Sequence, residues 1–201
     1  MIQKIFTLPL LISLPLGLDL RPIQSIRNWE TLQSGKINIE WTTYRGFPIS
    51  KAETILHYPI NEIAIVINDI EHYPSIFKRV TATKQLEPNI IQIILKMPFP
   101  FDGRDYIIKY DLEKFENTWV FSFHSVEHSD GLLNPKHVRL HNAAGIWILT
   151  KEAIDKTKVT YAWNGELLGN FPDFALYRAW ITQGNEILYW LGDALSKKNN
   201  S

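Results

Sequence analysis

The chain has 201 residues, with 21 basic and 21 acidic side chains and no cysteine. Its length fits one domain with a sizeable core, and its zero net charge, without any run of five like charges, argues against a nucleic-acid-binding protein, which needs a basic surface. The absence of cysteine excludes disulfides, cysteine-ligated zinc and thiol nucleophiles.

Residues 1–20 differ from the rest of the chain, because no charge falls between Lys4 and Asp19. Pro9 and Pro15 interrupt this apolar run, which is too short for a membrane-spanning helix of about 20 residues. A positive start before apolar residues is typical of a secretory signal peptide, although the small-residue cleavage pattern is missing. A signal peptide and an N-terminal arm packed on the domain both stay open. The protein is expected to be periplasmic or secreted in the first case and cytoplasmic in the second, with its domain over residues 21–201.

The first elements of this domain are predicted to be one helix and two strands. A short helix is expected over residues 22–33, because apolar side chains recur there every three residues and Gly35 can end it. Alternation predicts a strand over residues 36–44. Turn formers at residues 46–48 then lead to a second strand over 51–58.

The central part of the chain is predicted to hold one helix, a helical turn and six strands. Pro59 can open the helix and Asp69 can end it, and Tyr73 begins the helical turn. Pro98 and Pro100 fix their φ angles and remove two hydrogen-bond donors, so they predict a rigid hairpin end. The strands are expected at residues 80–86, 90–96, 106–115, 118–127, 138–150 and 158–166.

A long C-terminal helix of about 24 residues is expected from Asn170, which can cap it, and Pro172 near its start. Its natural partner is a curved antiparallel sheet. Residues spaced by three and four predict one apolar stripe along it: Phe174, Tyr177, Ile181, Gly184, Leu188, Leu191 and Leu195.

Seven short sequence pieces occur in an order that resembles a bacterial START domain, the lipid-transfer module of the helix-grip (Bet v1-like) superfamily. They are Asp69 with Tyr73-Pro74; Pro98 and Pro100 with Arg104-Asp105-Tyr106; Val126-Glu127-His128; Val138-Arg139; Trp147 with Leu149; residues 156–161; and Gly169 with Pro172. The resemblance implies an α+β helix-grip fold, in which a curved antiparallel sheet wraps around the C-terminal helix. It also implies a hydrophobic tunnel that holds one lipid-sized molecule, with no cofactor.

The strand pattern independently predicts three faces rich in aromatic rings. Tyr106 and Tyr110 share one face with Ile108 and Leu112, and the other two faces belong to residues 118–127 and 158–166. A filled aromatic core and a ligand cavity both fit this pattern, and the resemblance favours the cavity. The expected ligand-binding residues are Tyr110, Phe123, Tyr161, Trp163, Tyr177 and Ile181.

One departure from the family concerns sterols. Relatives that carry sterols often place a buried arginine six residues after the arginine of the Arg-Asp pair, and this chain has Tyr110 there, opposite an apolar strand around Ile91. This puts sterol binding in doubt and favours a ligand anchored by hydroxyl groups. Arg104, Asp105 and Arg139 are expected to make structural salt bridges at the tunnel end.

No catalytic or metal site is predicted. The spacing of the pairs His124/His128 and His137/His141 would suit a metal on a helix, but on a strand four residues separate the rings by about 13 Å. Neither a Gly-x-Ser-x-Gly elbow nor a Gly-rich phosphate loop is present.

Three functions stay open. A carrier of a lipid or similar hydrophobic molecule is favoured, acting as a monomer with transient membrane contact and no nucleic-acid partner. The alternatives are an enzyme resembling polyketide cyclases and aromatases, and a protein that binds partners through its surface. The tunnel gate is expected at residues 128–135 and 165–172, which contain glycine and proline.

Overall fold

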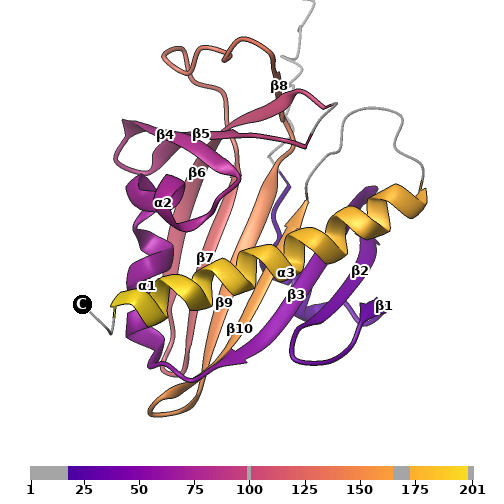
Figure 1. The fold of residues 1–201 in the computed structure, drawn as a ribbon, viewed down its shortest axis with the longest axis vertical. Coiled ribbons are helices and arrows are strands. Elements are labelled where there is room, and N and C mark those ends of the chain that lie inside the picture. Colours follow the sequence, from indigo (N-terminus) through magenta and orange to yellow (C-terminus); the bar gives the residue numbers. More distant parts are fainter. Residues whose placement is uncertain (1–17, 99–100, 165–172, 199–201) are drawn as a thin grey trace, which may run out of the picture.

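The computed structural model describes residues 18–98, 101–164 and 173–198 (Figure 1). The cap at Asn170, Pro172 and the gate segment 165–172 lie outside these residues, as do Pro100 and most of the N-terminal segment. In chain order the elements are η1 (Arg21–Ser25), β1 (Glu30–Gln33), β2 (Asn38–Tyr44), β3 (Phe47–Leu56), α1 (Ile60–Asn68), η2 (Ile70–His72), α2 (Tyr73–Ile76), β4 (Val80–Glu87), β5 (Ile90–Leu95), β6 (Gly103–Lys114), β7 (Thr118–Ser125), β8 (His137–Arg139), β9 (Ala144–Ala153), β10 (Lys156–Asn164) and α3 (Asp173–Lys198).

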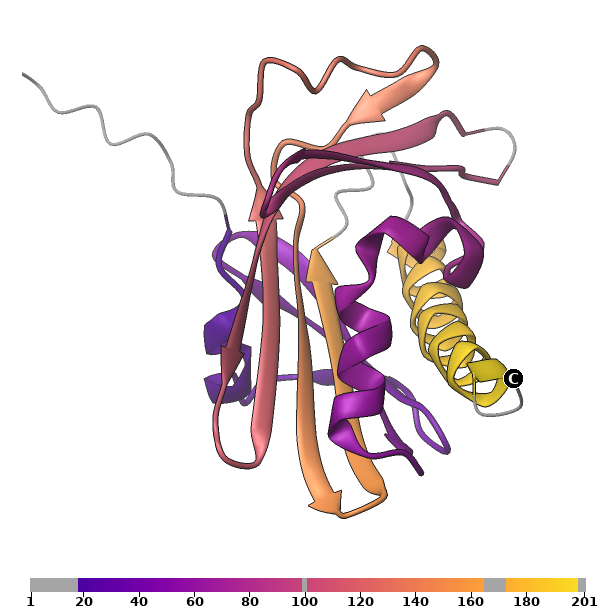
Figure 2. The ribbon, with the colours of Figure 1, turned by 90° about the vertical axis from the view of Figure 1, so that its left-hand side faces the viewer.

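The described strands form one curved sheet in the order β1-β2-β3-β10-β9-β7-β6-β5-β4, and β8 lies beside β6. All neighbours on this path are antiparallel, whereas β8 pairs with β6 in parallel. Helix α3 crosses the concave face, and Figure 2 shows α1 on the same side of the sheet. The predicted architecture of a curved antiparallel sheet around a long C-terminal helix is confirmed.

Two hydrophobic clusters cover the two faces of the sheet. The larger one joins the concave face to α1 and α3, and includes Ile63 and Leu191. The smaller one lies on the opposite face, where Leu18, Leu20 and Ile23 pack against side chains from β3 and β9. The concave cluster therefore positions α3 over the sheet. None of the described helices combines the length and the apolar character that a membrane span requires.

The predicted helix over residues 22–33 is wrong. The segment contains only the short 3-10 helix η1, and Ile26 after it is already extended, with φ −74° and ψ 126°. Its second half is strand β1, in which Glu30 pairs with Trp41 of β2. The three-residue spacing of apolar side chains did not produce a helix because β2 offers this segment backbone partners in the sheet.

The predicted strand over residues 138–150 is two strands with a turn between them. β8 pairs with β6 in parallel, whereas β9 runs antiparallel between β7 and β10. One straight strand cannot satisfy both pairings, so the chain turns at residues 140–143, where Leu140 and Ala143 are buried. The first hairpin also differs from the prediction, because its turn is Arg45–Gly46, with φ angles of 52° and 83°. β3 therefore already includes Pro48.

Candidate functional site

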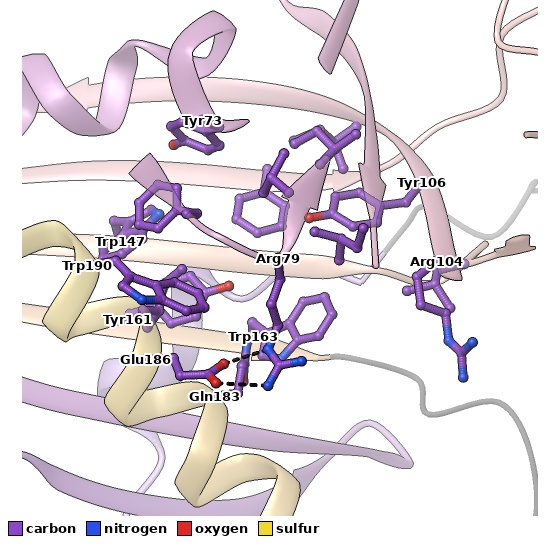
Figure 3. Close-up of a pocket in the computed structure, with 18 of the residues that line it drawn as sticks. Tyr73, Arg79, Arg104, Tyr106, Trp147, Tyr161, Trp163, Gln183, Glu186 and Trp190 are labelled. Carbon is purple, nitrogen blue, oxygen red and sulfur yellow. Dashed lines mark hydrogen bonds and ion pairs between the residues drawn. The ribbon is translucent and has the colours of Figure 1, made fainter. Parts of the chain in front are cut away.

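A cavity of about 590 Å³ lies between the concave face of the sheet and α3 (Figure 3). Its volume falls within the range of about 300–1,000 Å³ that is usual for ligand sites. Aromatic rings from four strands, β6, β7, β9 and β10, and from α3 line it, among them Tyr106, Trp147, Tyr161, Trp163 and Trp190. The lining is mostly aromatic and aliphatic, so the site suits an apolar molecule of lipid size.

The period of two along each strand places these rings. On β6 it directs Arg104, Tyr106, Ile108 and Tyr110 to the cavity. Trp147 of β9 and Tyr161 of β10 are cross-strand partners, with ring centroids 4.3 Å apart. The lining is therefore part of a continuous aromatic layer on the sheet.

A glycine in β9 makes room for one of the predicted rings. Gly145 is paired with Phe123 of β7, and a Cβ atom on Gly145 would lie 2.0 Å from Cζ of the Phe123 ring. Any larger residue at position 145 would therefore displace Phe123, which lines the cavity.

Four of the residues predicted to bind ligand lie on the cavity wall, and two do not. The cavity is lined by Tyr110, Phe123, Tyr161 and Trp163. Their role in ligand binding stays a prediction. The Tyr177 ring instead packs against Trp41 of β2, at a centroid distance of 5.3 Å, and Ile181 packs on the main core.

The reason lies in the rotation of α3. Its predicted apolar stripe rests on the sheet, where Gly184 approaches the side chains of Ile39 and Ala52. A neighbouring face of the helix meets the cavity instead and supplies Ala179, Thr182, Gln183, Glu186, Ile187 and Trp190.

Four tyrosines line the cavity, and three of them, Tyr73, Tyr106 and Tyr161, form a set of buried phenols. Burial raises the pKa of each phenol above its ordinary value. The Tyr73 hydroxyl donates to the carbonyl of Ile67 at 2.6 Å, and a side-chain hydrogen bond joins Tyr161 to Gln183 of α3. These groups are therefore neutral hydrogen-bonding groups at physiological pH. Outside this set, the Tyr110 hydroxyl donates a long hydrogen bond to the Pro88 carbonyl, at 3.5 Å.

An ion pair that the sequence did not reveal joins the edge of the sheet to α3. Nε of Arg79, just before β4, donates to Oε2 of Glu186 at 2.5 Å, and Nη2 donates to Oε1 at 2.9 Å. Figure 3 shows this two-bond contact beside Trp163. Both residues line the cavity, so the pair links the helix to the β4 side of the wall.

Asp105 and Arg139, each expected to make a structural salt bridge, form one with each other. Nε of Arg139 donates to Oδ1 of Asp105 at 2.8 Å, and Asp105 is fully buried. The side-chain amide of Gln92 and the backbone N–H of Asn134 donate to Oδ2 of the same carboxylate, at 2.9 and 3.1 Å. This network ties the segment before β8 to β5 and β6, behind the cavity wall.

The predicted salt bridge of Arg104 is wrong. Because Arg104 precedes Asp105 in a strand, its side chain points to the opposite face, which is the cavity. No carboxylate lies within ion-pair distance of it among residues 18–98, 101–164 and 175–198. Nη1 donates instead to the backbone carbonyls of Asp102 and Gly103, at 2.8 and 3.3 Å.

Within the described part of the chain, no group of three or more His, Asp or Glu side chains is arranged to hold a metal ion. Members of the two histidine pairs contact separate carboxylates. Nε2 of His128 lies 3.2 Å from Glu87, and Nδ1 of His141 lies 2.9 Å from Glu127.

Neither a protein-family model nor a curated protein sequence matches this chain. Solved structures do match. A STAR-related lipid transfer protein fragment from Xanthomonas axonopodis has a TM-score of 0.72 at 20% identity, over 84% of this chain and 98% of that one. Human StAR-related lipid transfer protein 5 has a TM-score of 0.75 at 14% identity, over 88% and 92%. The di-domain aromatase/cyclase BexL has a TM-score of 0.54 at 16% identity, over 76% and 48%. The chain thus has the START helix-grip fold.

Proposed function

We propose that this domain binds one lipid or similar hydrophobic small molecule in the cavity under α3 and transfers it between membranes. The cavity carries the proposal, because about 590 Å³ of mainly apolar space beneath the gripped helix is room for such a molecule. Two proteins of similar fold are named lipid transfer proteins, which supports the same function. Native mass spectrometry of the purified protein tests it, and a co-purified lipid is the expected result.

Two observations weigh against the alternative functions. A cyclase-like enzyme would use tyrosines of the cavity as acid-base groups, and a pKa near the working pH favours that role. Burial moves the pKa of Tyr73, Tyr106 and Tyr161 away from neutrality. A protein that binds partners only through its surface needs no internal space, so the cavity argues against that function.

We place the transient membrane contact of this carrier, acting as a monomer, on the loop between β7 and β8. Leu132 and Leu133 are 79% and 53% exposed there, although leucine is usually buried. The exposed ring of Phe101, in the β5–β6 loop, also lines the cavity. Exposed apolar side chains at these positions suit a carrier that contacts a bilayer while it takes up its lipid.

Replacing Tyr161 by phenylalanine should weaken ligand binding modestly and leave the ligand chemically unchanged. The substitution keeps the ring and removes one hydroxyl, and a neutral hydrogen bond is worth about 0.5–1.5 kcal/mol. Affinity should therefore fall about tenfold or less. The measurement is binding of the co-purified lipid, followed by mass spectrometry of the lipid after incubation.

The same substitution at Tyr110, which also lines the cavity, should behave alike, and Tyr189→Phe on the exposed face of α3 is the matched control. A product that forms with the unmodified protein and disappears with either cavity variant would favour the cyclase-like enzyme. General acid-base catalysis would show itself as a rate change of about 10²–10⁴-fold.

Clamping α3 to the sheet should stop lipid exchange between vesicles. A Cβ atom on Gly184 would lie 3.0 Å from Cβ of Ala52, slightly closer than the roughly 3.5–4.5 Å found in disulfides, so a small shift lets Ala52→Cys and Gly184→Cys form a bond. The chain has no other cysteine to compete. Exchange of a pyrene-labelled lipid should be slow when this variant is oxidised and recover on reduction.

The two single-cysteine variants control for the substitutions themselves. Equal exchange rates in the oxidised and reduced double variant would show that α3 does not move away from β3 when the ligand enters.

A further inference from the structure

The charged side chains of the cavity wall do not balance. Among the described residues, three arginines, Arg79, Arg104 and Arg178, line it together with one glutamate, Glu186, so positive charges exceed negative ones by two. The whole chain has no net charge. Glu186 is held by Arg79 through two hydrogen bonds, which leaves Arg104 and Arg178 without a carboxylate among the described residues. An otherwise apolar cavity thus carries an excess of positive charge.

Arg104 is the buried member of this set. The residue is 4% exposed, and its Nε–H group has no hydrogen-bond partner in the described structure. Its Nη1 group donates to two backbone carbonyls of its own loop, and Nη2 makes no hydrogen bond with the described residues. Burial lowers the pKa of the guanidinium, and only the nearby Asp102 acts in the opposite direction. A buried charge with unfilled donors is costly unless another group pairs with it.

The position of Arg104 separates it from the aromatic part of the cavity. In the view of Figure 3 its guanidinium lies at one end of the drawn residues, whereas Trp147 and Trp190 lie at the other. Its cross-strand partner is Leu95, and the cavity wall continues from there to Met97 and Pro98 in the β5–β6 loop. The cavity therefore has a cationic end and an end rich in rings, which is the polarity of an amphiphile.

We propose that Arg104 binds an oxyanion, the carboxylate or phosphate ester of an amphiphilic ligand whose apolar part lies along Trp147, Tyr161 and Trp163. This rests on the proposed binding function and names the class of ligand. The planar guanidinium matches the geometry of both oxyanions, and such charge-assisted bonds are stronger than neutral ones. A carboxylate or phosphate here would fill the free donors of Arg104 and neutralise its charge. Arg79 is a poorer candidate because Glu186 already satisfies it.

The test compares two probes that differ only in the anionic group: cis-parinaric acid and its methyl ester, measured by fluorescence titration. Arg104→Gln should weaken binding of the acid by about 10- to 100-fold, the range for a hydrogen bond to a charged group. It should change binding of the ester by less than about twofold, because a residue that does not interact with the ligand changes its affinity little. Arg104→Lys should bind the acid more tightly than Arg104→Gln does. Arg27→Gln, an exposed residue outside the cavity, is the matched control.

A second arm identifies the oxyanion. Dodecyl phosphate should displace the ester from the unmodified protein at a lower concentration than dodecanol does, and Arg104→Gln should remove this advantage. Inorganic phosphate alone should not displace the ester, and displacement by it would overturn the assignment to an amphiphile.

The remaining outcomes separate this inference from the proposed function. Equal losses of acid and ester in Arg104→Gln and Arg104→Lys would assign Arg104 a structural role and overturn the inference. Tight binding of both probes with no effect of Arg104→Gln would overturn it as well, while leaving the carrier function standing. Failure of both probes to bind the unmodified protein would overturn the carrier function and the inference together.

Discussion

Replacing Arg139 by methionine is expected to lower the free energy of unfolding by about 3–5 kcal/mol, because it leaves a buried carboxylate without its charged partner. Asp105 is fully buried, and Arg139 is the only cation within ion-pair distance of it among the described residues. Nη2 of Arg139 also donates to the Gly131 carbonyl at 2.8 Å, so the substitution loosens the segment before β8. For a chain of this length, such a loss lowers the melting temperature by roughly 6–20 °C.

Arg27→Met is the control, because Arg27 is exposed and makes no ion pair with any described residue; surface changes of this kind usually stay within about 0.5 kcal/mol. The double variant Arg139→Met with Asp105→Asn should be more stable than Arg139→Met alone. Its amide oxygen can still accept from Gln92 and Asn134 without carrying a buried charge. Thermal unfolding measures all three, and equal melting temperatures for Arg139→Met and Arg27→Met would contradict the role given to this pair.

The positions of most strands along the chain, and of the long last helix, could be predicted because they depend on local patterns of apolar and polar residues. A period of two along residues 106–112 sets which side chains of β6 share a face, whatever the strand pairs with. The same holds for β7 and β10, so Phe123, Tyr161 and Trp163 could be assigned to the concave face. The stripe that begins at Phe174 likewise predicted α3 as an amphipathic helix.

Pairing between distant segments could not be predicted in the same way. Residues 30–33 become a strand because β2 accepts them at the edge of the sheet, and their own spacing carries no sign of that. The bend at residues 140–143 exists because β8 pairs with β6 while β9 pairs with β7. Strand β1 and this bend both depend on contacts between segments that are far apart in the sequence, which local periodicity does not show.

The polar part of the site was missed for two different reasons. Arg79 and Glu186 are 107 residues apart, so no spacing could show their contact. Arg104 was within reach: it alternates with Tyr106 and must share its face, whereas Asp105 must not. The expectation that both Arg104 and Asp105 make structural salt bridges overlooked that adjacent strand residues point to opposite sides. On α3, the face that lines the cavity includes the polar residues Thr182, Gln183 and Glu186, so a search for an apolar stripe could not locate it.

Filling the cavity should abolish carriage without unfolding the protein. Ala179 lies on the face of α3 that lines the cavity, so Ala179→Trp places an indole in the space meant for the ligand. Ligand entry would then have to expel or overpack this ring, which costs about 3 kcal/mol, so affinity should fall by about a hundredfold or more. Transfer of a pyrene-labelled lipid between vesicles should fall in proportion, while the melting temperature changes little because the ring enters an apolar cavity.

Tyr189→Trp is the matched control, since it places the same ring on α3 at a position that is 66% exposed. It should bind and transfer lipid like the unmodified protein. Normal transfer by Ala179→Trp, in a variant that melts normally, would mean that the ligand is carried somewhere other than this cavity. Loss of transfer in both variants would instead point to the surface of α3, where an added ring could disturb contact with the membrane. Loss in Ala179→Trp alone ties transfer to the space between α3 and the sheet.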